Sequence, residues 1–421
     1  MSNKRKDSKG RVLRTGESQR PDGKYMFRYT DNSGKRMTVY SWKLVHSDKS
    51  RDGIREEIAL RDLEKQIAKD LEDKINTVDA ESTTVDDLFE QFMDIRKDLK
   101  ESSRCCYMDL YRKHVSPAIG SRKINQIKPT EIQKLYQTMI SNTGISPSTV
   151  QKIHSLIYQL FENAVLDNLL RTNPADRAFQ NIRKTTDLHS ISKEPLTVEQ
   201  QENLIDYIYQ SKRFHKIANL FTVLLGTGMR IGEALGLRWC DCDFQNGIIR
   251  VTHALLYKRG EDGRYRYRIS SPKTAAGFRE IPMFNDVREA LLREQKNKCK
   301  TEKEFTVDGF KGFIFLNSSG QVYTQSCIYD LIQAITTSYN QEEYFKALEE
   351  DRDPHYLPKI SAHIFRHTFC TRMSENNINI KVLQDVMGHR NIRTTMETYT
   401  KAMREKKIEE IQSLDGSFKL S

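Results

Sequence analysis

Four residues near the C-terminus have side chains that can take part in catalysis: His363, Arg366, His389 and Tyr399. His363 and Arg366 are three residues apart, so their side chains share one helix face and can reach the same small anion. His389 directly follows Gly388, and glycine is a common C-terminal helix stop. Tyr399 comes ten residues after that histidine.

These groups suit attack on a phosphodiester without a metal ion. A phenol with a pKa of about 10 is a poor nucleophile at neutral pH, but cationic and imidazole neighbours make its phenolate easier to form. An arginine can bind phosphate oxygens through its planar fork of donors. Tyr399 is therefore the candidate nucleophile and Arg366 a phosphate ligand. Each residue alone is more often a packing or surface residue, so the interpretation depends on the combination.

Three helices must position these side chains. The first is expected to begin at Ser361, a residue type that caps helices. Its apolar residues recur at helical spacing: Phe365, Phe369 and Met373. A second apolar helix is expected over about 380–387, and Asn391 and Thr394 can begin a third, which carries the tyrosine.

The pattern H-x-x-R, then G-H, then Y resembles the tyrosine recombinases, the phage-integrase-like site-specific recombinases. The resemblance implies an upstream arginine that opens a helix, and FTVLLGTGMRIGEALGLRW supplies Arg230, with Glu233 one turn later as a residue that orients a catalytic group. It also implies a lysine on a β-hairpin, and RYRYRISSPKTAAGFREIPM supplies Lys273. The implied catalytic set matches in type and order: Arg230, Lys273, His363, Arg366, His389 and Tyr399.

By this resemblance the chain cuts and rejoins DNA strands through a 3′-phosphotyrosyl intermediate, and so integrates and excises a mobile element. Arg230 and Arg366 would hold the non-bridging phosphate oxygens, and Lys273 would protonate the leaving 5′-oxygen. His363 would assist proton handling and His389 would hydrogen-bond the phosphate. No metal, nucleotide or other cofactor is required. The implied partners are double-stranded DNA at core and arm sites, a homo-tetramer on paired sites and an excisionase-type accessory protein.

Composition and charge fit a DNA-binding protein. The 421 residues hold 68 Lys plus Arg against 57 Asp plus Glu, a net charge of +11 that favours a polyanionic partner. No run approaches the roughly 20 apolar residues of a membrane span, and the polar N-terminus lacks the apolar core of a secretory signal. We therefore expect an intracellular protein with no membrane contact, and the resemblance implies a cytoplasmic, nucleoid-associated bacterial one. Seven cysteines form neither a disulfide framework nor a complete zinc motif.

The chain is expected to be a multidomain, mainly α protein with four parts: 1–78, 79–185, 186–403 and a tail over 404–421. Turn signals between alternating residues predict a three-stranded meander in the first part, followed by a helix over about 54–75. This part resembles the arm-binding domain of conjugative-transposon integrases, whose sheet enters the major groove. Expected DNA contacts are Arg20, Lys24, Tyr40 and Trp42. Alternation leaves the inward face open, so Tyr40 and Trp42 could instead pack under the helix.

The second part resembles the helical core-binding domain of the family, with Arg104 and Lys123 as expected DNA contacts. After a polar linker over 75–81, we expect a helix capped by Thr83 or Thr84. Further helices are expected over about 103–115, 128–140, 146–167 and, shorter, near 173–178. Residues 181–197 read as the linker to a mixed α/β catalytic domain, with strands over about 248–257, 265–270 and 278–282.

Two other functions are consistent with parts of this pattern. A type IB topoisomerase uses a similar tyrosine site to relax supercoils, and a non-catalytic DNA-binding regulator could keep the fold. The N-terminal strand module favours recombination over the first, and the complete catalytic set disfavours the second. The sequence leaves open the target DNA sequences, the bias between integration and excision, the accessory factors and the role of the tail.

Overall fold

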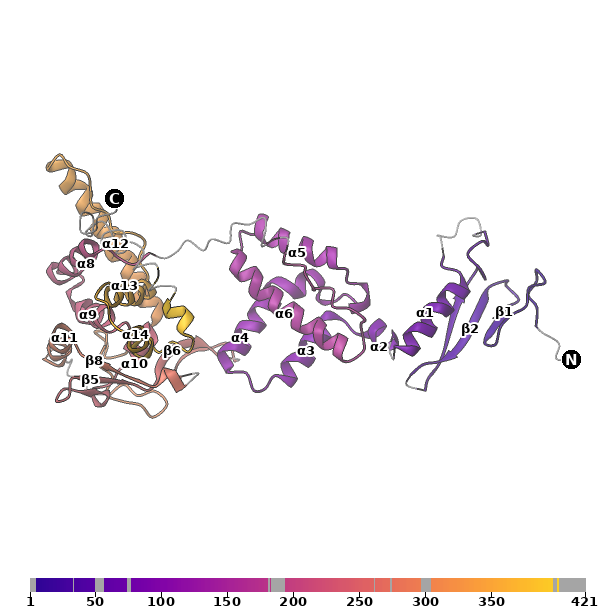
Figure 1. The fold of residues 1–421 in the computed structure, drawn as a ribbon, viewed down its shortest axis with the longest axis horizontal. Coiled ribbons are helices and arrows are strands. Elements are labelled where there is room, and N and C mark those ends of the chain that lie inside the picture. The colour runs from indigo at the N-terminus through magenta and orange to yellow at the C-terminus, as the bar shows by residue number, and fades with distance from the viewer. Residues whose placement is uncertain are drawn as a thin grey trace, which may run out of the picture. The chain divides into compact units, whose positions relative to one another are not determined.

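The structure is a computed structural model of the chain. It describes residues 5–32, 34–49, 57–73, 77–180, 182, 194–260, 262–272, 275–296, 304–396 and 400. The chain forms two compact units, Met1–His189 and Ser190–Ser421 (Figure 1). The described residues are mainly helical, and none of their helices has the length and apolar character needed to cross a bilayer.

The first element group is the predicted antiparallel meander, with strand order β1 (Glu17–Gln19), β2 (Tyr25–Thr30) and β3 (Arg36–Ser41). Helix α1 (Leu60–Glu72) packs on one face of this sheet. The register pairs Phe27 with Val39, and their side chains pack on the small core under the helix. Because side chains alternate along a strand, the neighbouring positions lie on the opposite, uncovered face, on which no described helix packs.

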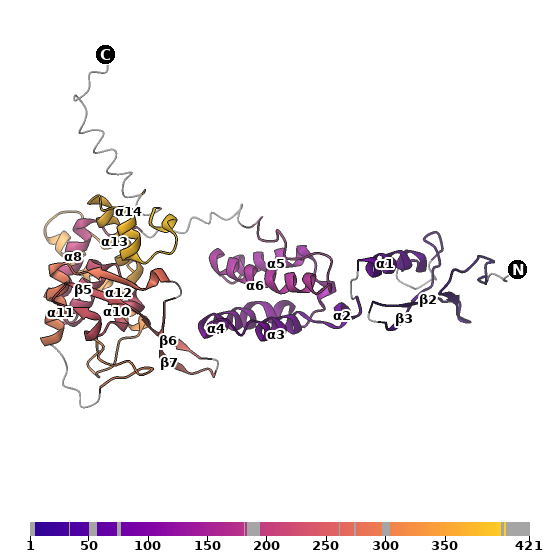
Figure 2. The ribbon, with the colours of Figure 1, turned by 60° about the horizontal axis from the view of Figure 1, so that its bottom comes forward.

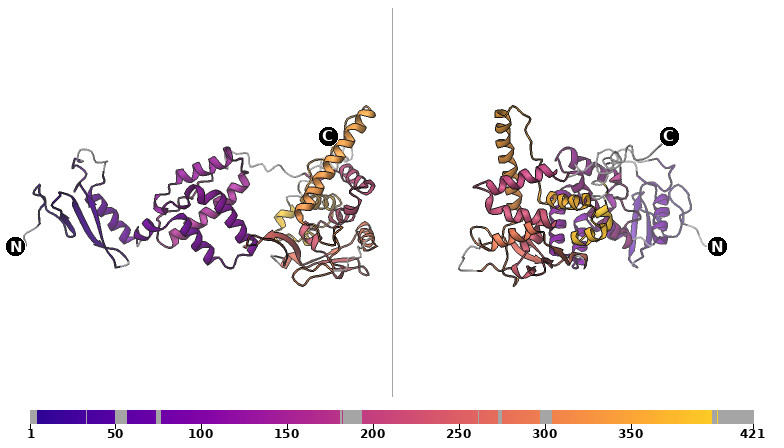
Figure 3. Two further views of the ribbon diagram at one scale, coloured as in Figure 1. Left: turned by 180° about the vertical axis from the view of Figure 1, so that it is seen from behind. Right: turned by 60° about the vertical axis from the view of Figure 1, so that its left-hand side comes forward.

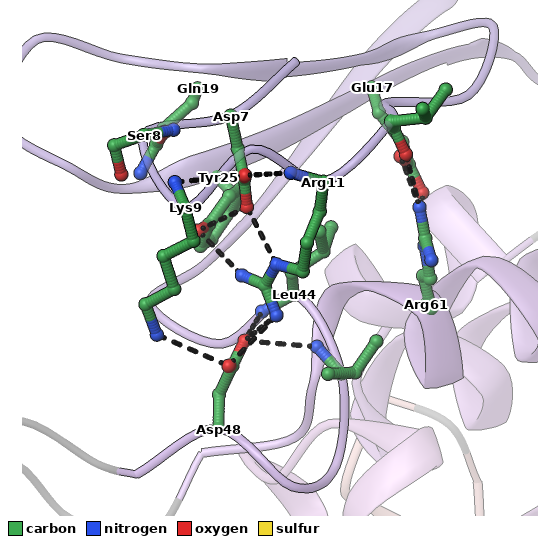
Figure 4. A network of polar contacts seen from close by, with 12 residues as sticks. Asp7, Ser8, Lys9, Arg11, Glu17, Gln19, Tyr25, Leu44, Asp48 and Arg61 are labelled. Carbon is green, nitrogen blue, oxygen red and sulfur yellow. Dashed lines mark hydrogen bonds and ion pairs between the residues drawn. The ribbon is translucent and has the colours of Figure 1, made fainter.

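Charged side chains reinforce this small core (Figure 4). Asp7 accepts hydrogen bonds from Arg11 Nε at 2.8 Å and from the Tyr25 hydroxyl at 3.0 Å. Arg11 continues to Asp48, with 2.9 Å between Nη1 and Oδ1. Burial acts to raise the pKa of Asp48, but the Leu44 N–H and Arg11 outweigh it and lower the pKa to about 2. Charge-assisted bonds of this kind hold the N-terminal residues on the sheet.

The helical block that follows contains α2 (Thr77–Ser82), α3 (Val85–Ile95), α4 (Glu101–Leu110), the π-helix η1 (Tyr111–Gly120), the 3-10 turn η2 (Ile124–Gln126), α5 (Pro129–Ser141) and α6 (Pro147–Leu166). Helices α3 and α5 both pack on α6 (Figure 2). Thr84 caps α3 as predicted, because its hydroxyl accepts from the Asp87 N–H at 3.1 Å and Asp87 accepts from the Thr84 N–H at 2.7 Å.

Two predictions for this block are wrong. The polar stretch 75–81 was expected to be a linker, but its described part belongs to α2, which buries Ala80 in the helical core. The short helix expected near 173–178 is instead a set of turns. One of these turns is closed by a 3.1 Å bond from the Ala178 N–H to the Ala175 carbonyl.

The C-terminal unit places most of its helices around a nearly fully buried helix, α9 (Ala218–Thr227). The other helices are α8 (Val198–Gln210), α10 (Ile231–Gly236), α11 (Asn285–Lys296), α12 (Gln325–Glu349), α13 (Ala362–Glu375) and α14 (Ile380–Met387), with the short 3-10 turns η3 (His215–Ile217), η4 (Trp239–Asp241) and η5 (Ala275–Gly277). Helices α11 and α13 pack on α9, and the end of α12 (orange) projects beyond the rest of this unit (Figure 3).

The strands of this unit form two small antiparallel sheets. One has the order β4 (Cys242–Asp243), β5 (Ile248–Val251) and β8 (Arg279–Pro282), and the other pairs β6 (Ala254–Arg259) with β7 (Tyr265–Ser270). The predicted strand over 248–257 is divided at Thr252 and His253. The buried His253 ring bonds the Gly236 carbonyl at 2.8 Å, which ties this break to the end of α10.

Candidate active site

Arg230 lies at the start of α10, directly after the turn that ends α9. Gly228 ends α9 with φ of 62°, in the left-handed region that glycine adopts easily. Glu233 accepts the Arg230 backbone N–H through Oε2 and the Arg230 guanidinium through Oε1, each at 2.8 Å. The carboxylate that caps the helix therefore also orients the arginine, whose side chain stays 43% exposed.

Arg366, on α13, is fixed by the ends of two helices. It is only 2% exposed, its Nη1 donates to the Gly228 carbonyl at 2.7 Å, and its Nη2 donates to the Met387 carbonyl. Carbonyls at helix C-termini carry partial negative charge, which favours a cation. Burial, followed by the charges of Arg230 and Arg279, lowers the pKa of Arg366 to about 9. The guanidinium remains charged at neutral pH.

His389 follows the end of α14, which stops at Gly388 as predicted. The φ angle of Gly388 is 62°. The Gln384 side chain donates to the His389 carbonyl, and His389 Nδ1 is hydrogen-bonded to the buried Thr395 hydroxyl, both at 2.9 Å. Burial, and then the charges of Arg366 and the other arginines of the site, lower the pKa of His389 to about 4. Its ring is therefore neutral at pH 7.

His363 lies in the first turn of α13, where its side chain is exposed. Its ring centroid is 4.7 Å from that of His367, with the two planes nearly perpendicular. Ser361 occupies the helix N-cap position as expected, but its side chain makes no capping hydrogen bond within the described part of the chain.

The structure brings four of the six predicted catalytic residues to one cavity of about 380 Å³. Its lining residues are Arg230, His363, Arg366, His367, Cys370, Met387, His389, Arg390, Asn391 and Thr394. Lys273 and Tyr399 lie outside the described residues. The third helix begins after Asn391 as predicted, since residues 392–396 are helical and the Arg393 N–H bonds the Asn391 side chain at 3.0 Å.

Sequence reasoning missed Arg279, a residue of β8 whose side chain is 4% exposed. Its Nη1 and Nη2 donate to the two carboxylate oxygens of Glu233 at 3.2 and 2.7 Å. Burial acts to raise the pKa of Glu233, but Arg279 and then Arg230 outweigh it and lower that pKa to about 2. The signal was present in the strand, because Arg279 is two residues from the buried Ile281 and so shares its inward face.

On the N-terminal sheet, the four expected DNA contacts lie together. Lys24 Nζ lies 5.8 Å from the ring centre of Tyr40 and 5.4 Å from that of Trp42, and the Arg20 guanidinium lies 5.7 Å from Tyr40. Tyr40 is 43% exposed and alternates with Val39, whose side chain packs toward α1. Tyr40 therefore belongs to the uncovered face and does not pack under the helix.

The two expected contacts of the helical block are engaged within the protein. Arg104 donates to the carbonyls of Met93 and Arg96, at 2.8 and 3.3 Å, at the end of α3. The Lys123 ammonium donates to the Ser82 carbonyl at the end of α2. Both side chains are half-buried, so they support helix ends, and their contact with DNA stays a prediction.

Comparison with known proteins agrees with this fold. Residues 194–406 match the phage integrase family, residues 1–71 the DNA binding domain of tn916 integrase, and residues 84–140 the phage integrase N-terminal SAM-like domain. The chain therefore belongs to the phage integrase family and is a tyrosine-type site-specific recombinase. These matches confirm the three predicted domain types, and they favour recombination over the topoisomerase alternative.

Within this family, the chain is of the Tn916 integrase type. It is 34% identical over 418 residues to the transposase from transposon Tn916 of Enterococcus faecalis, and equally to that from Tn1545 of Streptococcus pneumoniae. Each match covers 99% of this chain and 98% of the relative. The solved Tn1549 transposon integrase in complex with a circular intermediate DNA has a TM-score of 0.68 at 30% identity, covering 77% of this chain and 99% of that one.

Proposed function

We propose that this recombinase excises and integrates a transposon by two transesterifications, with Tyr399 as the nucleophile that forms a 3′-phosphotyrosyl link. The observation that carries the proposal is the convergence of Arg230, Arg366, His363 and His389 on one cavity. The Tn1549 integrase has been solved with transposon right end DNA and with circular intermediate DNA. That likeness supports transposon ends and their circular joined form as the DNA substrates of this chain.

Arg230 and Arg366 would hold the non-bridging oxygens of the scissile phosphate. A guanidinium has five N–H donors in a fixed fork, and the described contacts of Arg366 with Gly228 and Met387 use two of them. The remaining donors can face the cavity. Fixed donors of this kind stabilise the charge that develops on the pentavalent phosphorus, because they need no reorganisation during the reaction.

His389 would act as a neutral hydrogen-bond donor to the phosphate. Its low pKa keeps the imidazole uncharged at pH 7. When Nδ1 accepts a hydrogen bond from the Thr395 hydroxyl, the single ring proton resides on Nε2, which is then available to the ligand. His363 lines the same cavity and would accept the proton of the attacking phenol.

Lys273 would be the general acid that protonates the leaving 5′-oxygen. Lys273 and Tyr399 both lie outside the described residues, and support for their roles comes from their neighbours in the sequence. The Ala276 carbonyl, three residues after Lys273, lies 2.9 Å from the position that a Cβ on Gly388 would take. Thr395, four residues before Tyr399, bonds His389. Both neighbours therefore lie against the segment that carries His389.

The uncovered face of the N-terminal sheet would enter the major groove at arm-type sites, with Arg20, Lys24, Tyr40 and Trp42 as contacts. A twisted strand ribbon fits this groove, and the match to the DNA binding domain of tn916 integrase supports the assignment. The helical block would bind the core site mainly through phosphates. A homo-tetramer on paired sites and an excisionase-type partner complete the proposed assembly.

A nicked suicide substrate tests the chemistry, because the short fragment with the released 5′-hydroxyl diffuses away and the covalent complex accumulates. The wild-type chain should be trapped on this DNA. Tyr399→Phe should bind the same DNA with unchanged affinity and form no covalent complex. Trapping by Tyr399→Phe would make another residue the nucleophile, and failure of the wild-type chain to cross-link despite binding would favour a non-catalytic regulator.

A further inference from the structure

We propose that Arg279 is a positioning residue for strand cleavage, acting through Glu233 and through the C-terminal turn of α14. The inference rests on the proposed role of Arg230, Arg366 and His389 at the scissile phosphate. Arg279 is 4% exposed and is not among the described residues that line the cavity. Any effect on the reaction must therefore come from the groups that it holds and from its charge.

Three arginines bind three successive carbonyls at the end of α14. Arg279 Nε donates to Val386 O at 2.7 Å, Arg366 Nη2 donates to Met387 O, and Arg230 Nη2 donates to Gly388 O at 3.3 Å. The last carbonyls of a helix have no partner within the helix, so they need such donors. His389 directly follows Gly388, the last of these three residues. These bonds therefore set the position of the imidazole relative to both cavity arginines.

The other end of Arg279 controls how Glu233 holds Arg230. Arg279 donates to both oxygens of Glu233, at 3.2 and 2.7 Å, while Arg230 donates one guanidinium N–H to Oε1 at 2.8 Å. Arginine and carboxylate readily form a bidentate pair. Without Arg279, Glu233 could take two donors of Arg230 and withdraw them from the phosphate. Arg279 thus keeps donors of Arg230 available to the ligand.

Packing adds a second constraint between the strand and the helix end. A Cβ on Gly388 would lie 3.0 Å from Arg279 Cδ and 3.1 Å from Arg279 Nη1, so the arginine stem lies directly against this glycine. Arg279 therefore contacts α14 through its stem and through Nε, and contacts α10 through Nη1 and Nη2. One buried side chain connects the element that carries Arg230 to the one that precedes His389.

The test compares Arg279→Gln, Arg279→Lys, Glu233→Gln and the double variant Arg279→Gln/Glu233→Gln in the full-length chain. Single-turnover cleavage of the nicked substrate, DNA affinity and thermal unfolding are measured for each. Arg279→Gln should cleave about 10²-fold more slowly at unchanged DNA affinity. Arg279→Lys should recover part of the rate. The double variant should also stay slow, because the Val386 carbonyl still lacks its donor and Arg230 loses its charged partner.

Arg250→Gln is the matched control, since Arg250 lies on the adjacent strand β5 and pairs with Asp243 and Glu280 at the surface. It should cleave at the wild-type rate. A second readout is the NMR titration of His389: its pKa should rise in Arg279→Gln, because a neighbouring positive charge is removed. A purely structural role for Arg279 would lower the unfolding temperature without changing the cleavage rate of the folded fraction.

A folded Arg279→Gln variant that cleaves at the wild-type rate would overturn the proposal. If Arg279→Gln does not fold, the double variant is compared with Glu233→Gln, because it leaves no buried carboxylate without its partner. Slower cleavage than Glu233→Gln supports the proposal, since the Val386 carbonyl has then lost its donor as well, and equal cleavage rejects it. Covalent trapping by Tyr399→Phe would instead reject the proposed function itself. The two failures are therefore distinguishable.

Discussion

Arg366 Nη1 donates to the Gly228 carbonyl at 2.7 Å, so the arginine of α13 is fixed by the residue that ends α9. Gly228 is two residues before Arg230. The two cavity arginines, 136 positions apart in the sequence numbering (366 − 230), are thereby held on one backbone turn. A buried guanidinium that lacked such acceptors would lose its solvation without compensation.

This geometry predicts that Arg366→Lys loses most cleavage activity although it keeps the charge. A lysine ammonium has three donors at one point and cannot bind two separated carbonyls and a phosphate as a planar fork does. We expect cleavage of the nicked substrate to fall on the order of 10²–10³-fold at similar DNA affinity. Arg293→Lys, on the surface of α11, is the control and should cleave normally. Equal cleavage by Arg366→Lys and wild type would contradict the assignment.

Gly388→Ala should be destabilising for two separable reasons. Its φ of 62° strains any residue with a Cβ, at about 1–2 kcal/mol. In addition, the new Cβ would lie 2.9 Å from the Ala276 carbonyl. Gly247→Ala is the matched control, because Gly247 has φ of 65° but no described atom lies within 4 Å of its Cβ position.

Chemical denaturation of both glycine variants isolates the packing contribution as their difference in unfolding free energy. Gly388→Ala should lose more stability than Gly247→Ala, and it should also cleave more slowly because Arg279 and His389 must shift. Equal losses in both variants would show that the Gly388 contact relaxes without cost.

The placement of the cavity residues could be predicted where their signal is local. His363 and Arg366 share a helix face, and His389 follows a helix stop, so residue types and spacing sufficed. Arg279 was missed because its acceptors, Glu233 and the Val386 carbonyl, come from elements far apart in the sequence. A charged residue on the inward face of a strand indicates a buried partner, but the partner is set by tertiary packing.

Surface assignments were harder for the same reason. Alternation along β3 separates Tyr40 from Val39, but only the position of α1 decides which of them is covered. Arg104 and Lys123 are predicted DNA contacts, and nothing in the sequence indicates that both donate to backbone carbonyls at helix ends. Backbone acceptors carry no sequence signature, so bonds of this kind cannot be read from residue types.

The low pKa of His389 predicts a defined pH dependence of stability. Burial and the neighbouring arginines lower this pKa from 6.5 to about 4 in the folded state. Between these pH values the unfolded chain binds the proton more tightly than the folded chain does. The contribution of His389 to the free energy of unfolding is therefore complete above pH 6.5 and is lost as the pH falls toward 4. His389→Gln should weaken this dependence in denaturation curves recorded from pH 7 to 4.

His215→Gln, an exposed histidine on η3, is the matched substitution and should leave the pH dependence of wild type in place. If His389→Gln and wild type lose stability in parallel as the pH falls, the imidazole of His389 is not held neutral by its surroundings.

The N-terminal sheet should show the opposite pH dependence, because Glu64 lies against the buried Glu17. Burial, and then the Glu17 carboxylate, raise the pKa of Glu64 from 4.5 to about 7, and Glu64 Oε1 is buried without a hydrogen-bond partner among the described residues. A proton on Glu64 would remove the repulsion from the Glu17 carboxylate and would let the two carboxyl groups share a hydrogen bond. The stabilisation of the folded sheet by protonated Glu64 is complete below pH 4.5 and is lost as the pH rises through 7.

Hydrogen exchange of β2 amides in the full-length chain, corrected for intrinsic rates, should therefore show more opening at pH 8 than at pH 5. Glu64→Gln should remove the difference, whereas Glu72→Gln, an exposed position on the same helix, should retain it. Persistence of the pH effect in Glu64→Gln would assign it to another group.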